Sequence, residues 1–282
     1  MFTKILYINL DRRTDRKDHM EKELRKINWY GSMERISAIE GKNLSKSDLT
    51  NLLDNNAINE FMDTSDRQFA PGSYMSKGAA GCALSHRKCW ENILIHNHER
   101  VLILEDDIRF DKDFNEKLNT YLYQIQDYDI LYIGFHEARE STKYNEILKS
   151  PGEVVFGLFG YIVNKRVVQK LLDMFPIQGQ IDSEIRKIYN SIKVYHLNED
   201  LRIIYSDHSF NNSLGTDIQL IEKFHQHVNG SHHSLEHKCD ANTKINIKNI
   251  ILLDILIYIV IFFLLYLLLN DKMLKKLKLT PS

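Results

Sequence analysis

The sequence predicts an α/β domain organised around a largely parallel sheet. Short apolar runs of strand length alternate with longer stretches whose apolar residues recur at helical spacing, the pattern of strand–helix–strand units. The 282 residues are 43% hydrophobic and 27% charged with only 4 Pro, a composition typical of globular proteins. The chain can therefore bury a sizeable core.

The first predicted elements are a strand, a helix and a second strand. Residues 4–8 (KILYI) form a short apolar run, and a helix then begins at Thr14. One face of this helix carries Met20, Leu24 and Ile27. Residues 34–41 predict a second strand that ends at a turn. Residues 43–71 are polar and aperiodic, so we expect an irregular loop there.

A long helix is predicted next, over residues 76–97, because its apolar residues lie at helical spacings. Small residues near its start predict close packing on a neighbour. The later elements are the strand 101–104, a helix from near Asp111, the strands 129–134 and 154–164, and the helix 165–175. In α/β sheets ligands bind beyond the carboxyl ends of strands, so residues at those ends are the first functional candidates.

Three carboxylates crowd the end of one of these strands. In VLILEDDIRF a buried run leads directly into Glu105, Asp106 and Asp107, whose mutual repulsion raises the cost of ionising all three. A Glu-x-Asp pair can bind a divalent metal that carries a diphosphate. Alternatively, Asp106 or Asp107 only precedes the next helix, with its neighbours solvated. No glycine-rich phosphate loop occurs, which argues against dehydrogenases and P-loop enzymes.

Charge and cysteine content exclude two further classes. Lys+Arg 37 against Asp+Glu 38 leaves a net charge of -1, so no global basic field favours nucleic acid. The three cysteines are odd in number, and Cys82 and Cys89 lie two helical turns apart in an apolar stretch. They predict buried thiols rather than a disulfide framework.

Four sequence blocks occur in order along the chain: ILYINLDRRTDR, GAAGCALSHRKCW, VLILEDDIRF and DYDILYIG. Together they resemble glycosyltransferase family 25, and with later segments the resemblance extends from Lys4 to Gln219. It implies a GT-A fold of Rossmann type that binds a nucleotide sugar. It also implies a UDP-hexose donor (galactose or glucose), a divalent ion such as Mn²⁺, and an inverting transfer to a hydroxyl of a glycan, glycolipid or protein.

The resemblance also assigns the metal ligands. Glu105 and Asp107 match the two ends of the family's DxD-like motif, with Asp106 between them on the donor side. His208, next to Asp207 in the last matched segment, would complete the metal shell. A metal held by carboxylates neutralises the charge that grows on a nucleoside diphosphate leaving group.

Donor-binding residues come from two other blocks. Asn9, Asp11 and Arg16 match the first block, where the end of the first strand would meet the nucleotide. For Arg16 an exposed helix start is an equal alternative. Ser85 and His86 match the LSH element and are expected to bind the donor, although a lone helical His is more often structural.

An inverting transfer requires a base that removes the acceptor hydroxyl proton. Asp182 in QIDSEI matches an acidic position of the family and is the predicted base. An N-cap role at the start of the following helix is the competing interpretation.

The C-terminal part predicts a membrane anchor. Residues 250–269 are apolar apart from Asp254 and long enough to cross about 30 Å of hydrocarbon. We expect a catalytic domain over residues 1–224, a His-rich linker over 225–249 and a basic tail over 270–282. The linker's histidines could ligate Zn²⁺ or Cu²⁺, but their spacing fits no standard structural site, which favours a solvated tether.

A single C-terminal span without a preceding signal peptide predicts a catalytic domain in the cytosol. Four lysines after the span against three before it argue mildly the other way. Two competing functions stay open: a metal-dependent nucleotide-sugar phosphohydrolase, and a catalytically inactive membrane adaptor of the same fold.

We expect the full chain to partition with membranes, and a chain truncated after Asn249 to be soluble and active. Twenty nearly unbroken apolar residues cannot stay in water without aggregation. Protease added to sealed vesicles should digest a cytosolic catalytic domain. Protection of that domain, or glycosylation at Asn211 or Asn229, would reverse the predicted sidedness.

Overall fold

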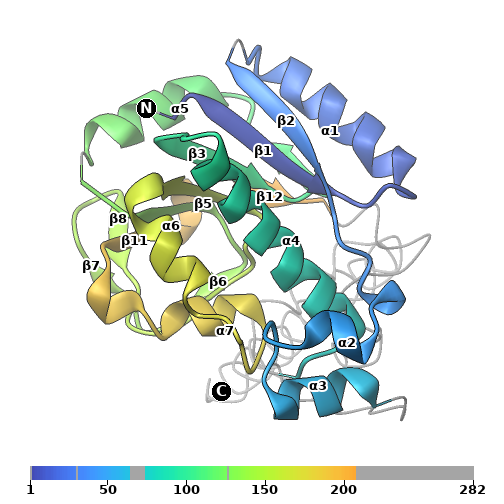
Figure 1. Ribbon diagram of the computed structural model, residues 1–282. Helices are drawn as coiled ribbons and strands as arrows, with labels where there is room; N and C mark the ends of the chain where they lie inside the picture. Colours follow the sequence, from blue (N-terminus) through green and yellow to red (C-terminus); the bar gives the residue numbers. More distant parts are fainter. Residues whose placement is uncertain (1, 30, 64–73, 126, 208–282) are drawn as a thin grey trace, which may run out of the picture. The chain divides into compact units, whose positions relative to one another are not determined.

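A mixed eight-stranded sheet forms the centre of the computed structural model (Figure 1). In spatial order its strands are β2 (Ser32–Ser37), β1 (Lys4–Asn9), β3 (Arg100–Leu104), β10 (Gly160–Asn164), β5 (Ile130–Gly134), β11 (Val194–Leu197), β8 (Leu148–Ser150) and β7 (Thr142–Lys143). The structure describes residues 2–29, 31–63, 74–125 and 127–207, all within one unit, residues 1–227.

Helices cover both faces of this sheet, as the alternation of strands and helices predicts. The α-helices of the described ranges are α1 (Thr14–Lys26), α2 (Lys46–Leu49), α3 (Asn55–Met62), α4 (Lys77–Ile95), α5 (Phe114–Tyr123), α6 (Lys165–Leu172) and α7 (Ile181–Arg186). Short 3-10 turns lie at Gly41–Asn43, Tyr189–Ser191 and Glu199–Leu201. Two small ribbons complete the fold: β4 (Ile108–Phe110) with β12 (Ile204–Ser206), and β6 (Glu137–Ala138) with β9 (Val155–Phe156).

Side-chain alternation divides the core into two clusters. In β1, Ile5 and Tyr7 pack in the cluster of α1 and α5, whereas Leu6 and Ile8 pack in the cluster of α4, α6 and α7. Successive strand residues point to opposite faces, so a strand covered on both faces is apolar throughout. In β3, residues 101–104 are fully buried, which explains why its sequence is an uninterrupted apolar run.

The close packing predicted for the start of the long helix is confirmed. Gly81 in α4 lies so near the preceding loop that an added Cβ would be 2.5 Å from the carbonyl oxygen of Ile39 and 2.8 Å from the nitrogen of Gly41. Only glycine allows two backbones to approach this closely. The contact fixes the depth at which α4 crosses the sheet.

The strand over residues 154–164 was predicted as one piece in a largely parallel sheet, and both expectations need correction. Gly157, at φ +89°, separates β9 from β10. β10 then runs antiparallel to both β3 and β5. The chain leaves β5 at Gly134 and re-enters the sheet at Gly160, which pairs with Gly134. Without a crossover to the opposite edge, the returning strand must run in the reverse direction.

The loop expected over residues 43–71 is also wrong in its described part. It contains α2 and α3, which bury Leu49, Ala57, Ile58 and Phe61. Asp54 caps α3 by accepting a hydrogen bond from the backbone N–H of Ala57 at 2.8 Å, a standard helix start signal. The buried residues were too widely spaced in a polar stretch to show a helical period.

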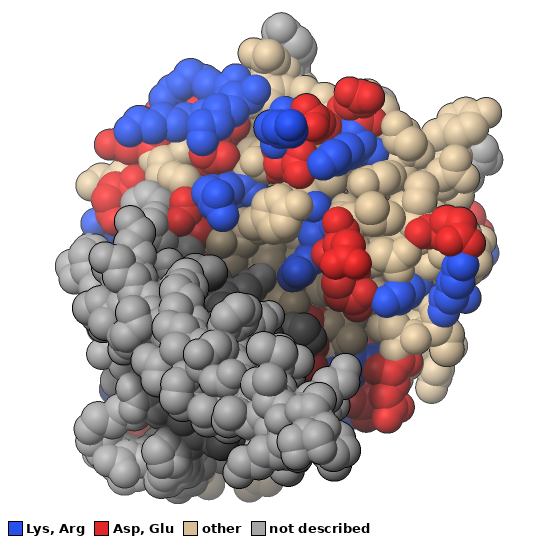
Figure 2. Space-filling model, turned by 180° about the vertical axis from the view of Figure 1, so that it is seen from behind, with Lys and Arg blue, Asp and Glu red and all other residues tan. Residues whose placement is uncertain are grey.

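No helix within the described ranges is long and apolar enough to cross a membrane. The predicted span over residues 250–269, the linker 225–249 and the tail 270–282 lie outside those ranges. On the face drawn in Figure 2, Lys and Arg side chains are interspersed with Asp and Glu. The described part of that face presents no broad surface of one charge.

Candidate active site

The acidic triplet forms the turn that joins β3 to β4, at one edge of the sheet. Leu104, the last residue of β3, pairs with Tyr7 of β1 and with Gly160 of β10. Gly160 in turn pairs with Gly134, the end of β5. The ends of three parallel strands and the start of β10 therefore meet beside this turn, the position at which α/β sheets bind ligands.

A positive charge of the protein itself lies among the three carboxylates. Arg16, in the first turns of α1, places Nη1 2.9 Å from Oδ1 of Asp106 and 3.3 Å from Oδ2 of Asp107. Asn9, the last residue of β1, donates from Nδ2 to Oδ2 of Asp106 at 2.7 Å. Burial raises the pKa of Asp106, while Arg16 and Asn9 oppose that rise. Asp106 is thus held on both oxygens inside the protein.

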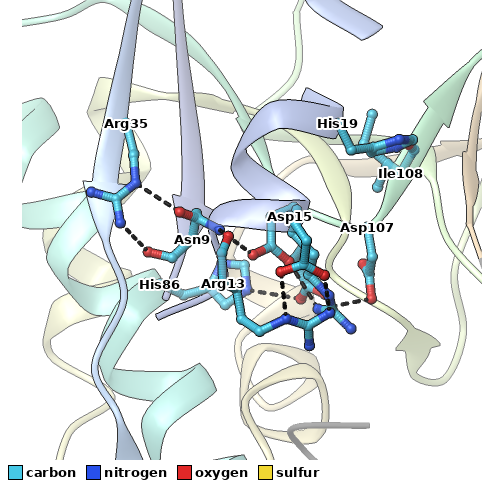
Figure 3. A network of polar contacts seen from close by, with 11 residues as sticks. Asn9, Arg13, Asp15, His19, Arg35, His86, Asp107 and Ile108 are labelled. Carbon is cyan, nitrogen blue, oxygen red and sulfur yellow. Dashed lines mark hydrogen bonds and ion pairs between the residues drawn. The ribbon is translucent and has the colours of Figure 1, made fainter. Parts of the chain in front are cut away.

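Arg35 of β2 contacts Asn9 (Figure 3) and also the exposed Asp11. Its Nε donates to Oδ1 of Asn9 at 2.7 Å, and its Nη2 donates to Asp11 at 2.5 Å. Ser37 donates a further bond to Asp11 at 2.9 Å. Hydrogen bonds from Arg35 and Ser37 lower the pKa of Asp11. Arg35 and Asp106 thus link Asn9 to Asp11 and to Arg16, and all three are bonded to protein groups. Their contact with a nucleotide stays a prediction.

Ser85 and His86 have different environments although they are neighbours. The buried Ser85 hydroxyl donates to the carbonyl of Gly81 at 2.6 Å and accepts the backbone N–H of Ile39 at 2.8 Å. It joins α4 to the loop after β2. Its contact with a donor stays a prediction that this geometry does not support.

His86 faces the acidic turn. It is fully buried, with Nε2 3.4 Å from Oε1 of Glu105 and Nδ1 3.0 Å from the hydroxyl oxygen of Tyr161. The indole N–H of Trp90 donates to the same hydroxyl at 3.0 Å. His86 is therefore oriented from behind by β10 and directed at Glu105.

Cys82 lies one helical turn before His86 on the same face of α4. The thiol sulfur, an imidazole nitrogen of His86 and a carboxylate oxygen of Glu105 all lie within 4.8 Å of one another. Burial raises the pKa of the Cys82 thiol well above its usual value, and the charges of Glu105, Asp182 and Asp107 add to that rise. These three carboxylates belong to two elements, the acidic turn and α7.

Asp182 is the second residue of α7, and Gln180 occupies the N-cap position. Burial raises the pKa of Asp182, and backbone N–H groups of Ser183 and Gly157 oppose the rise. The positive φ of Gly157 is a conformation that L-residues rarely adopt. The negative charge of Glu105 also raises the pKa of Asp182, so this residue shares the field of the acidic turn.

The strand β12 brings the end of the described chain to the same turn. The backbone N–H of Asp207 donates to the carbonyl of Asp107 at 2.5 Å. His208, the predicted third metal ligand, is the next residue and lies outside the described residues.

Sequence reasoning missed several residues of this site. Cys82 was interpreted only as a buried thiol, although the Cys-x-x-x-His spacing with His86 was visible. Arg35, Tyr161 and Trp90 belong to different strands and a helix, and no local pattern connects them with the acidic turn.

Comparison with known proteins decides the family. The model of the family described as "Glycosyltransferase family 25 (LPS biosynthesis protein)" matches residues 2–185, which include every block around the acidic turn. This chain belongs to glycosyltransferase family 25.

Family 25 relatives carry different activities in their names. Procollagen galactosyltransferase 2 of Homo sapiens is 28% identical over 216 residues, 71% of this chain and 33% of that protein. Inactive glycosyltransferase 25 family member 3 of Homo sapiens is 28% identical over 188 residues, 64% of this chain and 30% of that protein. The chain thus spans about a third of the length of these relatives.

Among solved structures, a glycosyltransferase involved in the glycosylation of the major capsid of PBCV-1 matches with a TM-score of 0.39 and 10% identity. The match covers 72% of this chain and 91% of that chain. A similarity this low carries no argument about the site.

An ion pair between Arg13 and Asp15 at the start of α1 makes the stability of this protein depend on pH. Arg13 is 2% exposed and donates from Nε and Nη2 to Asp15 at 3.0 and 2.8 Å. These hydrogen bonds lower the pKa of Asp15 from 3.8 to about 2.

We expect the variant Asp15→Asn to lose a contribution that is present above pH 4 and disappears as the pH falls towards 2. A carboxyl with a lowered folded-state pKa stabilises the fold only while it is ionised. Because Asp15 is 43% exposed, the loss should stay below about 1 kcal/mol. Urea unfolding at several pH values measures it, with Asp18→Asn on the same helix as the control. An unfolding difference between wild type and Asp15→Asn that is constant from pH 7 to 2 would contradict the assignment.

Proposed function

We propose that this chain is an inverting glycosyltransferase with a GT-A-like, Rossmann-type domain over residues 1–224. It would move a hexose, galactose or glucose, from a UDP-sugar to a hydroxyl of a glycan, glycolipid or protein. The observation that carries the proposal is the acidic turn, at the ligand-binding edge of the sheet in a family 25 chain. Arg16 and Asn9 occupy Asp106, while Glu105 and Asp107 remain 23% and 16% exposed.

The oxygen atoms of the turn fit a divalent metal. Glu105 and Asp107 would hold the ion, and His208 would be a third ligand. The family resemblance favours Mn²⁺ as the ion. Both carboxylates keep partial exposure, whereas Asp106 is bonded to protein groups on both oxygens. When bound, the ion neutralises charge on the nucleoside diphosphate leaving group.

Asp182 is the proposed base, which accepts the proton of the acceptor hydroxyl as that oxygen attacks the sugar carbon. A carboxylate with a raised pKa accepts a proton more readily than an ordinary one. Glu184, the other acidic residue of α7, instead accepts the backbone N–H of Gly179 at 3.0 Å and pairs with Lys187. Because the Glu184 carboxylate is engaged in these structural contacts, Asp182 is the better candidate for the base.

Donor recognition would use the remaining residues of the first block. Asp11 is exposed at the end of β1 beside the turn, and it is the member of this block most open to a nucleotide. Asn9 and Arg16 would act by holding Asp106 and thereby the shape of the turn. Of the two predicted residues in the LSH element, His86 would contribute to the donor site indirectly, by positioning the carboxylate of Glu105.

Two other functions remain as alternatives. A phosphohydrolase would use the same carboxylates on water and would consume a nucleotide sugar without an acceptor. An inactive adaptor is favoured by one observation, that a relative of similar identity is named inactive. For the full chain we propose a single C-terminal membrane anchor, on the sequence of residues 250–269 alone. A catalytic domain in the cytosol is part of the same proposal.

A screen of UDP-sugars with and without Mn²⁺, followed by thermal melting of the full chain, tests the donor class. A donor at one hundred times its Kd should stabilise the fold by about 2.7 kcal/mol. An acceptor-dependent release of UDP identifies a transferase, and acceptor-independent release identifies the phosphohydrolase. Absence of any Mn²⁺-dependent shift would contradict the metal-assisted donor site.

The two neighbouring aspartates should separate catalysis from stability. Asp107→Asn should fold normally and lose less stability than Asp106→Asn, because Arg16 keeps Asp106 as its nearer partner. It should lose almost all transfer, because one anionic metal ligand is gone. Asp106→Asn should lower the free energy of unfolding by about 2–3 kcal/mol, because Arg16 loses a buried charged partner. Denaturant unfolding and transfer assays measure both. A near wild-type rate for Asp107→Asn in Mn²⁺ would remove the metal assignment.

The base assignment predicts a split between turnover and donor affinity. Asp182→Asn should reduce kcat by about 100- to 10,000-fold and leave the Kd for the donor nearly unchanged, because the proton is removed only in the reacting complex. Single-turnover kinetics and donor titration measure the two quantities. Glu184→Gln is the matched variant and should affect stability more than rate. A collapse of donor binding in Asp182→Asn would make it a binding residue instead.

A further inference from the structure

A thiol, an imidazole and a carboxylate converge behind the acidic turn, and the thiol of Cys82 has no role in the proposed donor site. Cys82 and His86 stand four residues apart on α4, the spacing that places two side chains on one helix face. Glu105 reaches them from the end of β3. The three ligand atoms lie within 4.8 Å of one another, so small rotations bring them around one ion.

The imidazole is already directed at this point by groups behind it. Tyr161 places its hydroxyl oxygen 3.0 Å from Nδ1 of His86, and that oxygen also accepts the indole N–H of Trp90 at 3.0 Å. A metal-ligating histidine ordinarily donates its second ring N–H to an oxygen of this kind. Nδ1–H bonded to Tyr161 leaves the Nε2 lone pair facing Glu105 and Cys82. His86 is fully buried, so this orientation is fixed by packing.

The donor set selects the class of ion. Thiolate and imidazole with one carboxylate are ligands of Zn²⁺, whereas Mg²⁺ and Mn²⁺ prefer oxygen ligands. An ordinary cysteine thiol is mostly protonated at neutral pH, whereas the metal ligand is the thiolate. Binding therefore breaks the S–H bond, forms a metal–sulfur bond and releases the proton to solvent.

We propose that Cys82, His86 and Glu105 form an inhibitory Zn²⁺ site that shares Glu105 with the catalytic metal seat. The inhibition rests on the proposed transferase function, whereas the site itself does not. Zn²⁺ bound to Cys82 and His86 would draw the Glu105 carboxylate towards α4, away from the position beside Asp107 in which it would hold the catalytic ion. Three protein ligands leave a fourth position open for water.

Cobalt spectroscopy of the full chain tests the site directly. Co²⁺ replaces Zn²⁺ and gives a near-ultraviolet charge-transfer band only when a thiolate is bound. The band should appear in the wild type and be lost in Cys82→Ser. Cys89→Ser is the matched control, because Cys89 is buried on the same helix but away from the carboxylates of the acidic turn. Cys239→Ser removes the thiol of the His-rich stretch, which could otherwise be the thiolate that binds Co²⁺.

The proposal predicts that both control variants retain the band. A band that survives in Cys82→Ser, a band lost in Cys239→Ser, or no band in the wild type would each overturn it. A second measurement needs no variant. Zn²⁺ should slow the alkylation of Cys82, and mass spectrometry of the peptide that contains Cys82 measures the rate. Equal alkylation with and without Zn²⁺ would also overturn the site.

The support from β10 gives a further test. Tyr161→Phe keeps the ring and removes the hydroxyl oxygen 3.0 Å from Nδ1 of His86, which would accept the Nδ1–H of a zinc-bound imidazole, so Zn²⁺ affinity should fall by about 10- to 100-fold. Tyr132→Phe is its control, because Tyr132 is buried in the neighbouring strand and its hydroxyl contacts Tyr189 instead. Equal affinities of the wild type and Tyr161→Phe would contradict the geometry.

Inhibition is measured separately, with transfer assayed at fixed Mn²⁺ and increasing Zn²⁺. Cys82→Ser should need at least about tenfold more Zn²⁺ for half-inhibition than Cys89→Ser, by the scale on which single supporting groups change metal affinity. Equal inhibition of the two variants would overturn the inhibitory role. If the chain has no transferase activity, the proposed function fails, and the cobalt band still decides whether the site exists.

Discussion

The acidic turn of this protein depends on the ion pairs that Arg16 forms with Asp106 and Asp107. Three consecutive carboxylates at the end of a buried strand repel one another and resist burial. Arg16 reaches two of them from α1, and Asn9 supplies a neutral donor from β1. The pair ties the first helix and first strand to the β3–β4 turn across about ninety residues of sequence. The turn therefore has a defined shape before any ligand is considered.

This arrangement gives the three carboxylates of the turn different roles. Asp106 uses both oxygens inside the protein, which a metal site alone would not require. Its neighbours on either side keep partial exposure, and Glu105 in particular lies between two environments. On one side are the polar groups around Asp107, and on the other are the thiol and imidazole of α4. Competition for a single carboxylate is a direct way for one ion to oppose another.

The sequence predicted those features that depend on local periodicity. The apolar run of β3, the amphipathic face of α1 and the small residues at the start of α4 each carry their own signal. The direction of β10 does not, since it depends on where the chain returns to the sheet after residues 135–159. Even so, the absence of a predicted helix between residues 134 and 154 was a usable clue, because parallel neighbours need a crossover.

The candidate site divides in the same way. The acidic turn was visible because three like charges follow a buried strand. That Arg16 is their counter-ion was not visible, since its alternatives were an exposed helix start or a nucleotide contact. Tyr161 and Trp90 reach His86 only through tertiary packing. Side-chain partners from distant segments have no periodic signature, whereas the residues that stand at strand ends do.

The reversed direction of β10 determines which of its side chains reaches the active edge. Tyr161 is the second residue of this strand, so entry from the carboxyl edge places its ring next to the site. Threaded in the opposite direction, the same five residues would put Tyr161 where Val163 now lies, about 7 Å further along the strand. A phenol at that position could not touch an imidazole that it now meets at 3.0 Å. The path of the backbone, as much as the identity of the residue, therefore determines the chemistry available at this edge.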